Sequence, residues 1–108
     1  MRKSLMRMTL RQLQIFNEVC DLRSYSRAAE EMSLTQPAVS LQIRQLEERL
    51  GLRLFHRRPR GVELSAEGQR LALTVSEAYG SIDAELRRLD AGETVVRALR
   101  RSQFFTTP

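Results

Sequence analysis

The sequence predicts a mainly α-helical fold with one small two-stranded β element and a long C-terminal helix. Three observations support this fold class. Apolar residues recur at helical spacing within 10–20, 36–50 and 66–89, and a capping residue precedes each of these segments. Residues 52–64 alternate apolar with polar side chains instead. A chain of 108 residues has room for one small domain and hardly for two.

Capping residues place the first two helices. Thr9 can accept a hydrogen bond from the first turn of a helix, and Gln12 completes a capping box with it. A short second helix begins at Ser24 or Ser26, and its predicted apolar positions are Tyr25, Ala28, Ala29 and Met32. The apolar face of the first helix is predicted to consist of Leu10, Leu13, Phe16, Val19 and Cys20.

The third helix follows after a tight connection. Thr35 is its predicted cap, and Pro37 lies in the first turn, where the missing N–H costs nothing. The helix runs to about Leu50, and Gly51 can end it in a left-handed conformation. A helix, a short helix, a tight turn and a long helix together form a helix-turn-helix.

A basic hairpin and a long fourth helix complete the chain. The predicted strands are 52–56 and 62–64, joined by a turn at 59–61. Ser65 caps the fourth helix, which continues to about Leu89, and Gly92 is predicted to end it. The expected domains are a winged helix-turn-helix at 8–65, a linker and dimerisation helix at 66–91, and a tail at 92–108 without assigned structure.

The outward face of the third helix suits DNA. At about 100° per residue, Val39, Ile43 and Leu46 face the core, and the acids Glu47 and Glu48 come only in the last turns. The N-terminal half therefore offers no repulsion to phosphates and can enter a major groove. A solvated face on an ordinary bundle helix is the alternative. The candidate base contacts are Gln36, which suits adenine, Pro37 and Leu41, which suit thymine methyl groups, and Ser40 and Arg44.

The charge pattern also favours nucleic acid. The net charge is +5, and all but one of the 18 basic residues are arginine, whose planar fork suits phosphates and guanine edges. No acid lies among the four arginines between Gly51 and Gly61, so we expect them to contact the DNA backbone or a minor groove, although a solvated charge run is the alternative. These candidate contacts are Arg53, Arg57, Arg58 and Arg60.

The fourth helix carries one narrow apolar stripe at near coiled-coil spacing. About 24 residues of helix span about 36 Å, which is longer than so small a domain can cover. We therefore expect a homodimer through this helix, with Gly80 allowing a close crossing, and the alternative is a helix that packs back on its own domain. The predicted stripe is Leu71, Val75, Ala78, Ile82, Leu86 and Leu89.

Other function classes have little support. Cys20 is the only cysteine and His56 the only histidine, so we expect no disulfide, metal site, cofactor or catalytic residue. The sequence has no glycine-rich phosphate loop, no membrane-length apolar run and no secretory signal, which favours a cytoplasmic protein. A module that only pairs with other proteins through its long helix is one rival to DNA binding, and an enzyme is the other.

These residues resemble the N-terminal DNA-binding domain of the LysR-type bacterial transcriptional regulators. The resemblance runs from residue 8 to about 90 and is highly specific as a set. The matching pieces are Leu10–Leu13 with Phe16, Ser24–Ala29, Leu34–Ser40, Gln42–Glu47, Leu50–Gly51, Leu54–Phe55 with Arg57, and Leu64–Gly68.

The resemblance implies a winged helix-turn-helix, a linker helix that forms the dimer, and a partly palindromic site in double-stranded DNA. It implies that Gln36, Pro37 and Ser40 face the major groove. It also implies that Arg57 and Arg60 reach phosphate or the minor groove, and that Ser26 and Thr35 contact the DNA backbone.

Two departures from the family pattern change these expectations. The family often has a polar or basic residue at Leu41, so methyl contact is expected there instead of a hydrogen bond. Family members also continue into an effector-sensing domain, whereas this sequence stops at Pro108. We therefore expect an isolated or truncated DNA-binding part without a small-molecule effector site.

Overall fold

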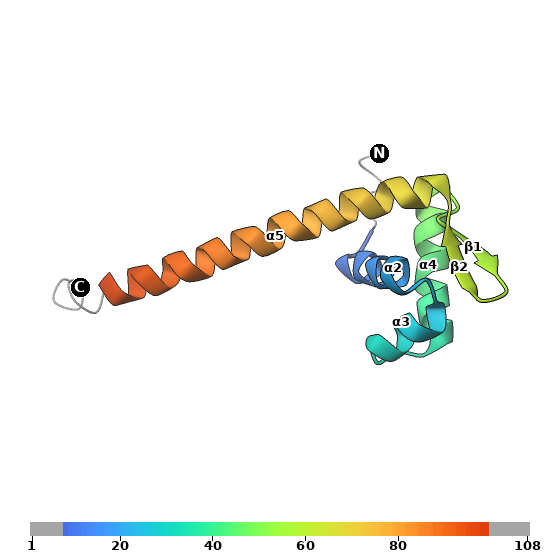
Figure 1. The fold of residues 1–108 in the computed structure, drawn as a ribbon, viewed down its shortest axis with the longest axis horizontal. Helices are drawn as coiled ribbons and strands as arrows, with labels where there is room; N and C mark the ends of the chain where they lie inside the picture. Colours follow the sequence, from blue (N-terminus) through green and yellow to red (C-terminus); the bar gives the residue numbers. More distant parts are fainter. Residues whose placement is uncertain (1–7, 100–108) are drawn as a thin grey trace. The chain divides into compact units, whose positions relative to one another are not determined.

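The structure is a computed structural model that describes the backbone of residues 8–99 and the side chains of residues 8–91. Its elements follow the order α2 (Leu10–Leu22), α3 (Tyr25–Glu31), α4 (Gln36–Leu50), β1 (Phe55–Arg58), β2 (Gly61–Leu64) and α5 (Ala66–Leu99) (Figure 1). The predicted fold class, mainly α with a small β wing and a long final helix, is confirmed. The chain divides into two compact units, Met1–Ser76 and Glu77–Pro108.

Local capping explains where the first three helices begin. Thr9 and Gln12 form the predicted capping box of α2, with the Gln12 backbone N–H donating to Thr9 Oγ1 at 3.0 Å. Ser24, one of the two candidates, caps α3, and Thr35 caps α4. Gly51 ends α4 with φ of 68°, the left-handed conformation that glycine adopts without strain.

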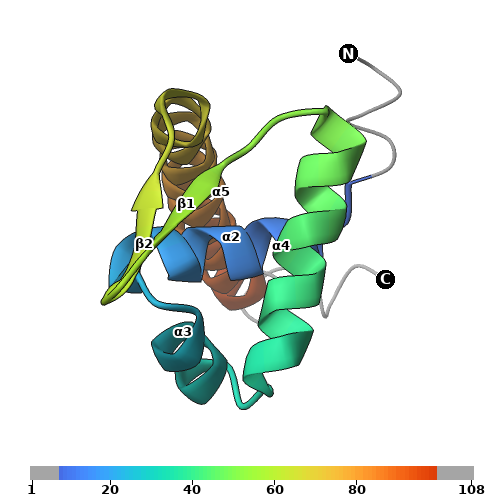
Figure 2. The same cartoon turned by 90° about the vertical axis from the view of Figure 1, so that its right-hand side faces the viewer.

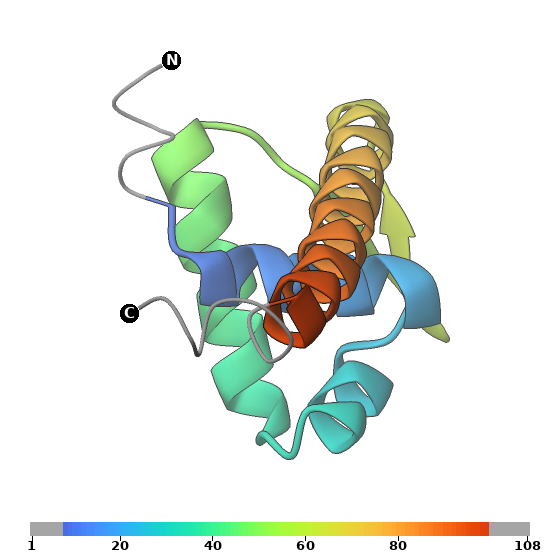
Figure 3. The ribbon, with the colours of Figure 1, turned by 90° about the vertical axis from the view of Figure 1, so that its left-hand side faces the viewer.

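In the first unit, α2, α3 and α4 pack against one another (Figures 2 and 3), and the hairpin stands across from α4, with α2 between them (Figure 2). The core is formed by the side chains that these elements turn inward. Two details differ from the sequence prediction: Leu10 is 64% exposed, and Ile15 takes a core position instead. Leu10 is the first residue of α2, so no neighbouring turn covers it. The largest fully buried side chains are Phe16, Ile15, Ile43, Leu46, Leu54, Val19 and Val39.

The hairpin is antiparallel and pairs Phe55 with Leu64 and Arg58 with Gly61. Its first strand starts at Phe55 and not at Leu52 as predicted. The segment before it is held differently, because the Leu54 and Phe55 backbone N–H groups both donate to one carboxylate oxygen of Glu47 on α4, at 2.7 and 3.3 Å. The start of the wing is therefore fixed to α4 by hydrogen bonds from its backbone N–H groups to the Glu47 side chain.

Helix α5 is longer than predicted. It continues through Gly92 to Leu99, so the expected stop at Gly92 is wrong, and residues 92–99, to which the sequence analysis assigned no structure, are helical. A single glycine inside a helix costs only about 1 kcal/mol relative to alanine, and neighbouring residues can offset that cost. The rest of the predicted tail, 100–108, lies outside the described residues.

Candidate nucleic-acid interface

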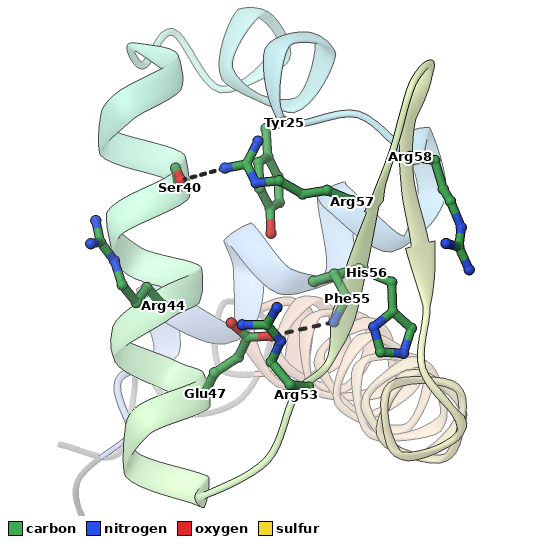
Figure 4. A pocket seen from close by; sticks show the side chains of 9 residues that line it. All are labelled: Tyr25, Ser40, Arg44, Glu47, Arg53, Phe55, His56, Arg57 and Arg58. Atoms are coloured by element: carbon green, nitrogen blue, oxygen red, sulfur yellow. Dashed lines mark hydrogen bonds between the residues drawn. The ribbon is translucent and has the colours of Figure 1, made fainter.

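The exposed half of α4 is the first component of the candidate site. Gln36, Pro37 and Leu41 are exposed and Ser40 is half-buried, whereas Val39 and Ile43 are buried. The helical faces are therefore as the sequence predicts. Arg44 is also exposed and extends from α4 on the side away from the hairpin (Figure 4). The candidate base contacts thus lie on one continuous face of the helix.

Thr35 has two tasks that are compatible. Its hydroxyl oxygen accepts a hydrogen bond from the Ala38 backbone N–H at 3.2 Å, which caps the helix. The hydroxyl proton remains available as a donor, because a threonine can donate and accept at once. Ser26, in the first turn of α3, is exposed and also able to donate.

Strand alternation separates the basic side chains of the wing. Arg57 points from β1 toward α4, whereas Arg58 points to the opposite side of the hairpin (Figure 4). Arg58 Nε lies 2.6 Å from Glu63 Oε2, an exposed ion pair across the two strands. Hydrogen bonding to Arg58 is the main reason that the pKa of Glu63 lies below its usual value. Glu63 therefore lies near the wing arginines in space, although in the sequence it follows the acid-free segment between Gly51 and Gly61.

A pocket of about 730 Å³ lies between α4 and the hairpin. Its polar lining is strongly basic, with Glu47 as the single carboxylate among the lining residues. Glu47 accepts two backbone hydrogen bonds, so part of its charge is already engaged. The lining residues are Tyr25, Ser40, Arg44, Glu47, Arg53, Phe55, His56, Arg57 and Arg58.

Arg57 joins the wing to the candidate reading face. Its Nη2 donates to Ser40 Oγ at 3.3 Å, and its guanidinium carbon lies 5.2 Å from the centre of the Tyr25 ring (Figure 4). Burial, and then the charge of Glu47, raise the pKa of Tyr25 above its ordinary value. The phenol is therefore neutral at physiological pH, and Arg57 faces a ring and not a phenolate.

Sequence reasoning missed the parts that Tyr25 and Glu47 have in this arrangement. Tyr25 was interpreted only as an apolar position of the second helix, and Glu47 only as an acid far from the bases. Neither residue carries a local signal, because their partners lie in the hairpin. An aromatic side chain in a helix next to an arginine-rich hairpin is the one hint that the sequence offers.

Other chemistry has no counterpart among the described residues. Within them, no three histidine, cysteine, aspartate or glutamate side chains are grouped as a metal site would require. None of the described helices is long and apolar enough to cross a membrane. Cys20 is buried, and burial followed by the charge of Asp21 raises its pKa to about 12, so its thiol is unreactive.

Fold and site together define a winged helix-turn-helix domain, the class in which one helix enters the major groove of DNA. Residues 10–69 match the family described as bacterial regulatory helix-turn-helix proteins of the lysR family. The chain belongs to this family, and the matched part is its DNA-binding domain.

Relatives and solved structures agree with this assignment. The chain is 40% identical over 104 residues to the HTH-type transcriptional regulator CfxR of Cupriavidus necator, covering 91% of this chain and 33% of that protein. The DNA-binding domain of BenM with benA site 1 DNA superposes with a TM-score of 0.73 and 31% identity, over 78% of this chain and 94% of that one. The corresponding complex of CbnR gives 0.71 and 29%, over 80% and 99%.

These comparisons also bear on the other predictions. The matched proteins are transcriptional regulators, a family that is not enzymatic. This chain spans a third or less of the length of the first curated relatives it matches. The functions that these relatives carry out as whole proteins are therefore not assigned to this chain.

Proposed function

We propose that this chain reads a specific double-stranded DNA sequence as a homodimer, with α4 in the major groove and the hairpin beside it. The observation that carries the proposal is the Arg57–Ser40 hydrogen bond, which joins the basic wing and the exposed face of α4 into one surface. Two copies would place their α4 helices on half-sites related by two-fold symmetry, as dimeric helix-turn-helix proteins do. The compartment that fits this activity is the bacterial cytoplasm.

The proposed contacts divide by chemistry. Gln36 can pair with adenine, Ser40 and Arg44 can hydrogen-bond to base edges, and Pro37 and Leu41 can contact thymine methyl groups. Ser26 and Thr35 would donate to phosphates. The arginines of the wing would supply affinity more than sequence choice, because phosphates are alike in every sequence. These wing contacts are Arg53, Arg57, Arg58 and Arg60.

We also propose the division of labour along the chain. Residues 8–65 would bind DNA, and 66–91 would link and pair the subunits. Support for pairing comes from α5, where Ile82, Leu86 and Leu89 are all more than half exposed. Val75, by contrast, is buried and Leu71 half-buried, so we narrow the pairing stripe to its exposed members, Ala78, Ile82, Leu86 and Leu89.

The proposal predicts selective weakening of binding. Gln36→Ala should weaken binding to the selected duplex by about tenfold or more while leaving a scrambled duplex unaffected, because a bidentate base contact contributes about 1–3 kcal/mol of discrimination. The measurement is fluorescence anisotropy with a labelled duplex recovered from a random library by the wild-type protein, across a salt series. Gln14→Ala, at an exposed position of α2, is the matched control.

Two results would contradict the proposal. One is affinity that does not change with salt, because arginine–phosphate contacts release counterions. The other is equal affinity for selected and scrambled duplexes. Dimers without any DNA affinity would favour the protein-interaction module instead.

A further inference from the structure

Arg57 is held at three points although it is exposed. Its Cα pairs with Val62 across the hairpin, its guanidinium lies over the Tyr25 ring, and its Nη2 donates to Ser40 Oγ. An exposed arginine otherwise samples many rotamers, and ordering it on binding reduces affinity. Here much of that ordering is present before any DNA arrives.

The Tyr25 ring is itself fixed from behind. It meets Phe55 edge-on, with ring centres 6.1 Å apart and an interplanar angle of 85°. Phe55 is 4% exposed and lies 5.5 Å, centre to centre, from the fully buried Phe16. The Tyr25 ring, on which the Arg57 guanidinium lies, is therefore fixed to the hydrophobic core through Phe55.

This platform sets the direction of Arg57. Strand alternation already turns Arg57 to the face of the hairpin toward α4, and Arg58 to the other face (Figure 4). Without the Tyr25 ring, however, the long side chain of Arg57 could extend along the hairpin toward its tip. With it, the guanidinium stays beside Ser40, on the surface that faces the proposed major groove. The nitrogens of a guanidinium carry five N–H donors, so most remain free when one bonds to Ser40.

We infer that Tyr25 is a positioning residue for DNA recognition: it holds Arg57 beside Ser40, so that guanidinium and hydroxyl meet the DNA as one preformed pair. The inference rests on the proposed function and adds to it. The pair presents a fork of donors, which suits two acceptors side by side, either two phosphate oxygens or the O6 and N7 atoms of a guanine. The inference also places Arg57 at the edge of the major groove, whereas the sequence alone allowed a contact in the minor groove.

The test compares four variants by fluorescence anisotropy, using the labelled duplex selected on the wild-type protein: Tyr25→Leu, Tyr25→Phe, Arg57→Ala and the double variant Arg57→Ala with Tyr25→Leu. Tyr25→Leu keeps an apolar side chain but removes the aromatic face, and we expect about two- to tenfold weaker binding, the range of a cation–π contact. Tyr25→Phe keeps the face and should bind close to wild type. In an Arg57→Ala background, Tyr25→Leu should cause no further weakening, because the ring would then have nothing to position.

The salt series separates the two acceptors. If Arg57 binds phosphate, Arg57→Ala lowers the slope of log affinity against log salt by about 0.9 for each phosphate that the side chain no longer neutralises. If Arg57 binds guanine, the slope changes little and the preference at one position of the duplex relaxes. Either result is consistent with Tyr25 as the positioning residue.

Two results would overturn the inference alone. In one, Tyr25→Leu binds as tightly as wild type; in the other, it weakens binding equally with and without Arg57. Thermal unfolding of each variant shows whether it is folded at the assay temperature, and Tyr25→Met, with a flexible apolar side chain, replaces Tyr25→Leu if that variant unfolds. A wild-type protein that does not prefer the selected duplex would instead overturn the proposed function.

Discussion

Two glycines of the first unit stand directly against backbone carbonyl groups. A Cβ atom on Gly61 would collide with the carbonyl oxygen of Arg23, and one on Gly68 with that of Leu54. Gly61 also has φ of 125°, a conformation that side chains rarely adopt. The close approach of the hairpin to the end of α2, and of the start of α5 to the segment before β1, therefore depends on the missing side chains.

Gly61→Ala should lower the free energy of unfolding by about 2–4 kcal/mol, because it adds overpacking to a strained backbone. Urea denaturation followed by circular dichroism measures the change. Gly80→Ala is the matched control, since nothing in the single chain lies within 4 Å of a Cβ built there. Compared in the Leu86→Glu background, where no helix crossing can involve Gly80, it should stabilise α5 by up to about 1 kcal/mol. Equal effects of the two substitutions would contradict the role of Gly61.

Cys20 should make the fold sensitive to alkali. Burial raises the pKa of its thiol from 9.0 to about 12, so the unfolded chain loses this proton at lower pH than the folded chain does. The contribution to stability is therefore complete below about pH 9 and is lost as pH rises from 9 toward 12.

Chemical denaturation at pH 7 to 10 tests this. The stability difference between wild type and Cys20→Ala should shrink above pH 9. Tyr25 and Tyr79 have raised pKa values too, both chiefly through burial, but they are present in both proteins and cancel in the difference. A difference that stays constant across this pH range would exclude the Cys20 explanation.

Among the elements, the position of the hairpin depends on one acid of α4. Glu47 accepts the backbone N–H groups of Leu54 and Phe55, and without it two donors at the start of β1 would lose their partner. An acid beside basic side chains on a DNA-binding face is unfavourable for phosphate, so its structural role accounts for its presence there.

Glu47→Ala should therefore reduce both stability and DNA affinity. Removing hydrogen bonds to a charged acceptor costs about 1.5–3 kcal/mol. Hydrogen exchange at the Leu54 and Phe55 amides should accelerate, which links the destabilisation to the hairpin. Glu48→Ala, at the exposed neighbouring position, should change stability by less than about 0.5 kcal/mol. If Glu48→Ala had the same effect as Glu47→Ala, the anchoring role would be wrong.

The elements also show where sequence reasoning succeeds. Thr9, Ser24 and Thr35 cap their helices through hydrogen bonds to N–H groups three residues ahead, and such local chemistry is readable from the sequence alone. Gly51 ends α4 for an equally local reason. The exposed face of α4 follows from helical periodicity.

What the sequence could not supply depends on contacts between distant residues. Gly61 and Arg23 are far apart in the sequence although they are in contact, as are Arg57 and Ser40, and no local sequence pattern predicts these contacts. The start of β1 was misplaced for the same reason, because Glu47 controls it. The end of α5 was misplaced because a glycine lowers helix stability without forbidding a helix.

At the scale of the whole molecule, an apolar stripe of the second unit is left exposed. Ile82, Leu86 and Leu89 are 53%, 58% and 58% exposed. On the same unit, the ion pairs Asp83–Arg87 and Glu85–Arg88 are exposed and contribute little. Helix α5 therefore gains most if a second copy covers its stripe, which is the pairing that we propose.

Leu86→Glu should convert dimers to monomers, because it places a charge at the centre of an apolar contact. Sedimentation velocity at several concentrations measures the change. Ala91→Glu adds the same charge on the opposite face, since nine residues at about 100° each place it about 180° from Ile82. It should leave the dimer intact, and a wild-type protein that sediments as a monomer at every concentration would exclude pairing through this stripe.

The backbone anchoring of the hairpin has a consequence for how such a protein acquires a new target. The Val62 N–H donates to the Arg23 carbonyl at 3.1 Å, and Leu54 and Phe55 bind Glu47 through their N–H groups, so no outward side chain is needed to place the wing. Substitutions at exposed positions such as Gln36, Leu41 or Arg60 can accumulate while the scaffold keeps its geometry. After duplication of its gene, a chain of this kind can exchange the bases it prefers without redesigning the frame that presents them.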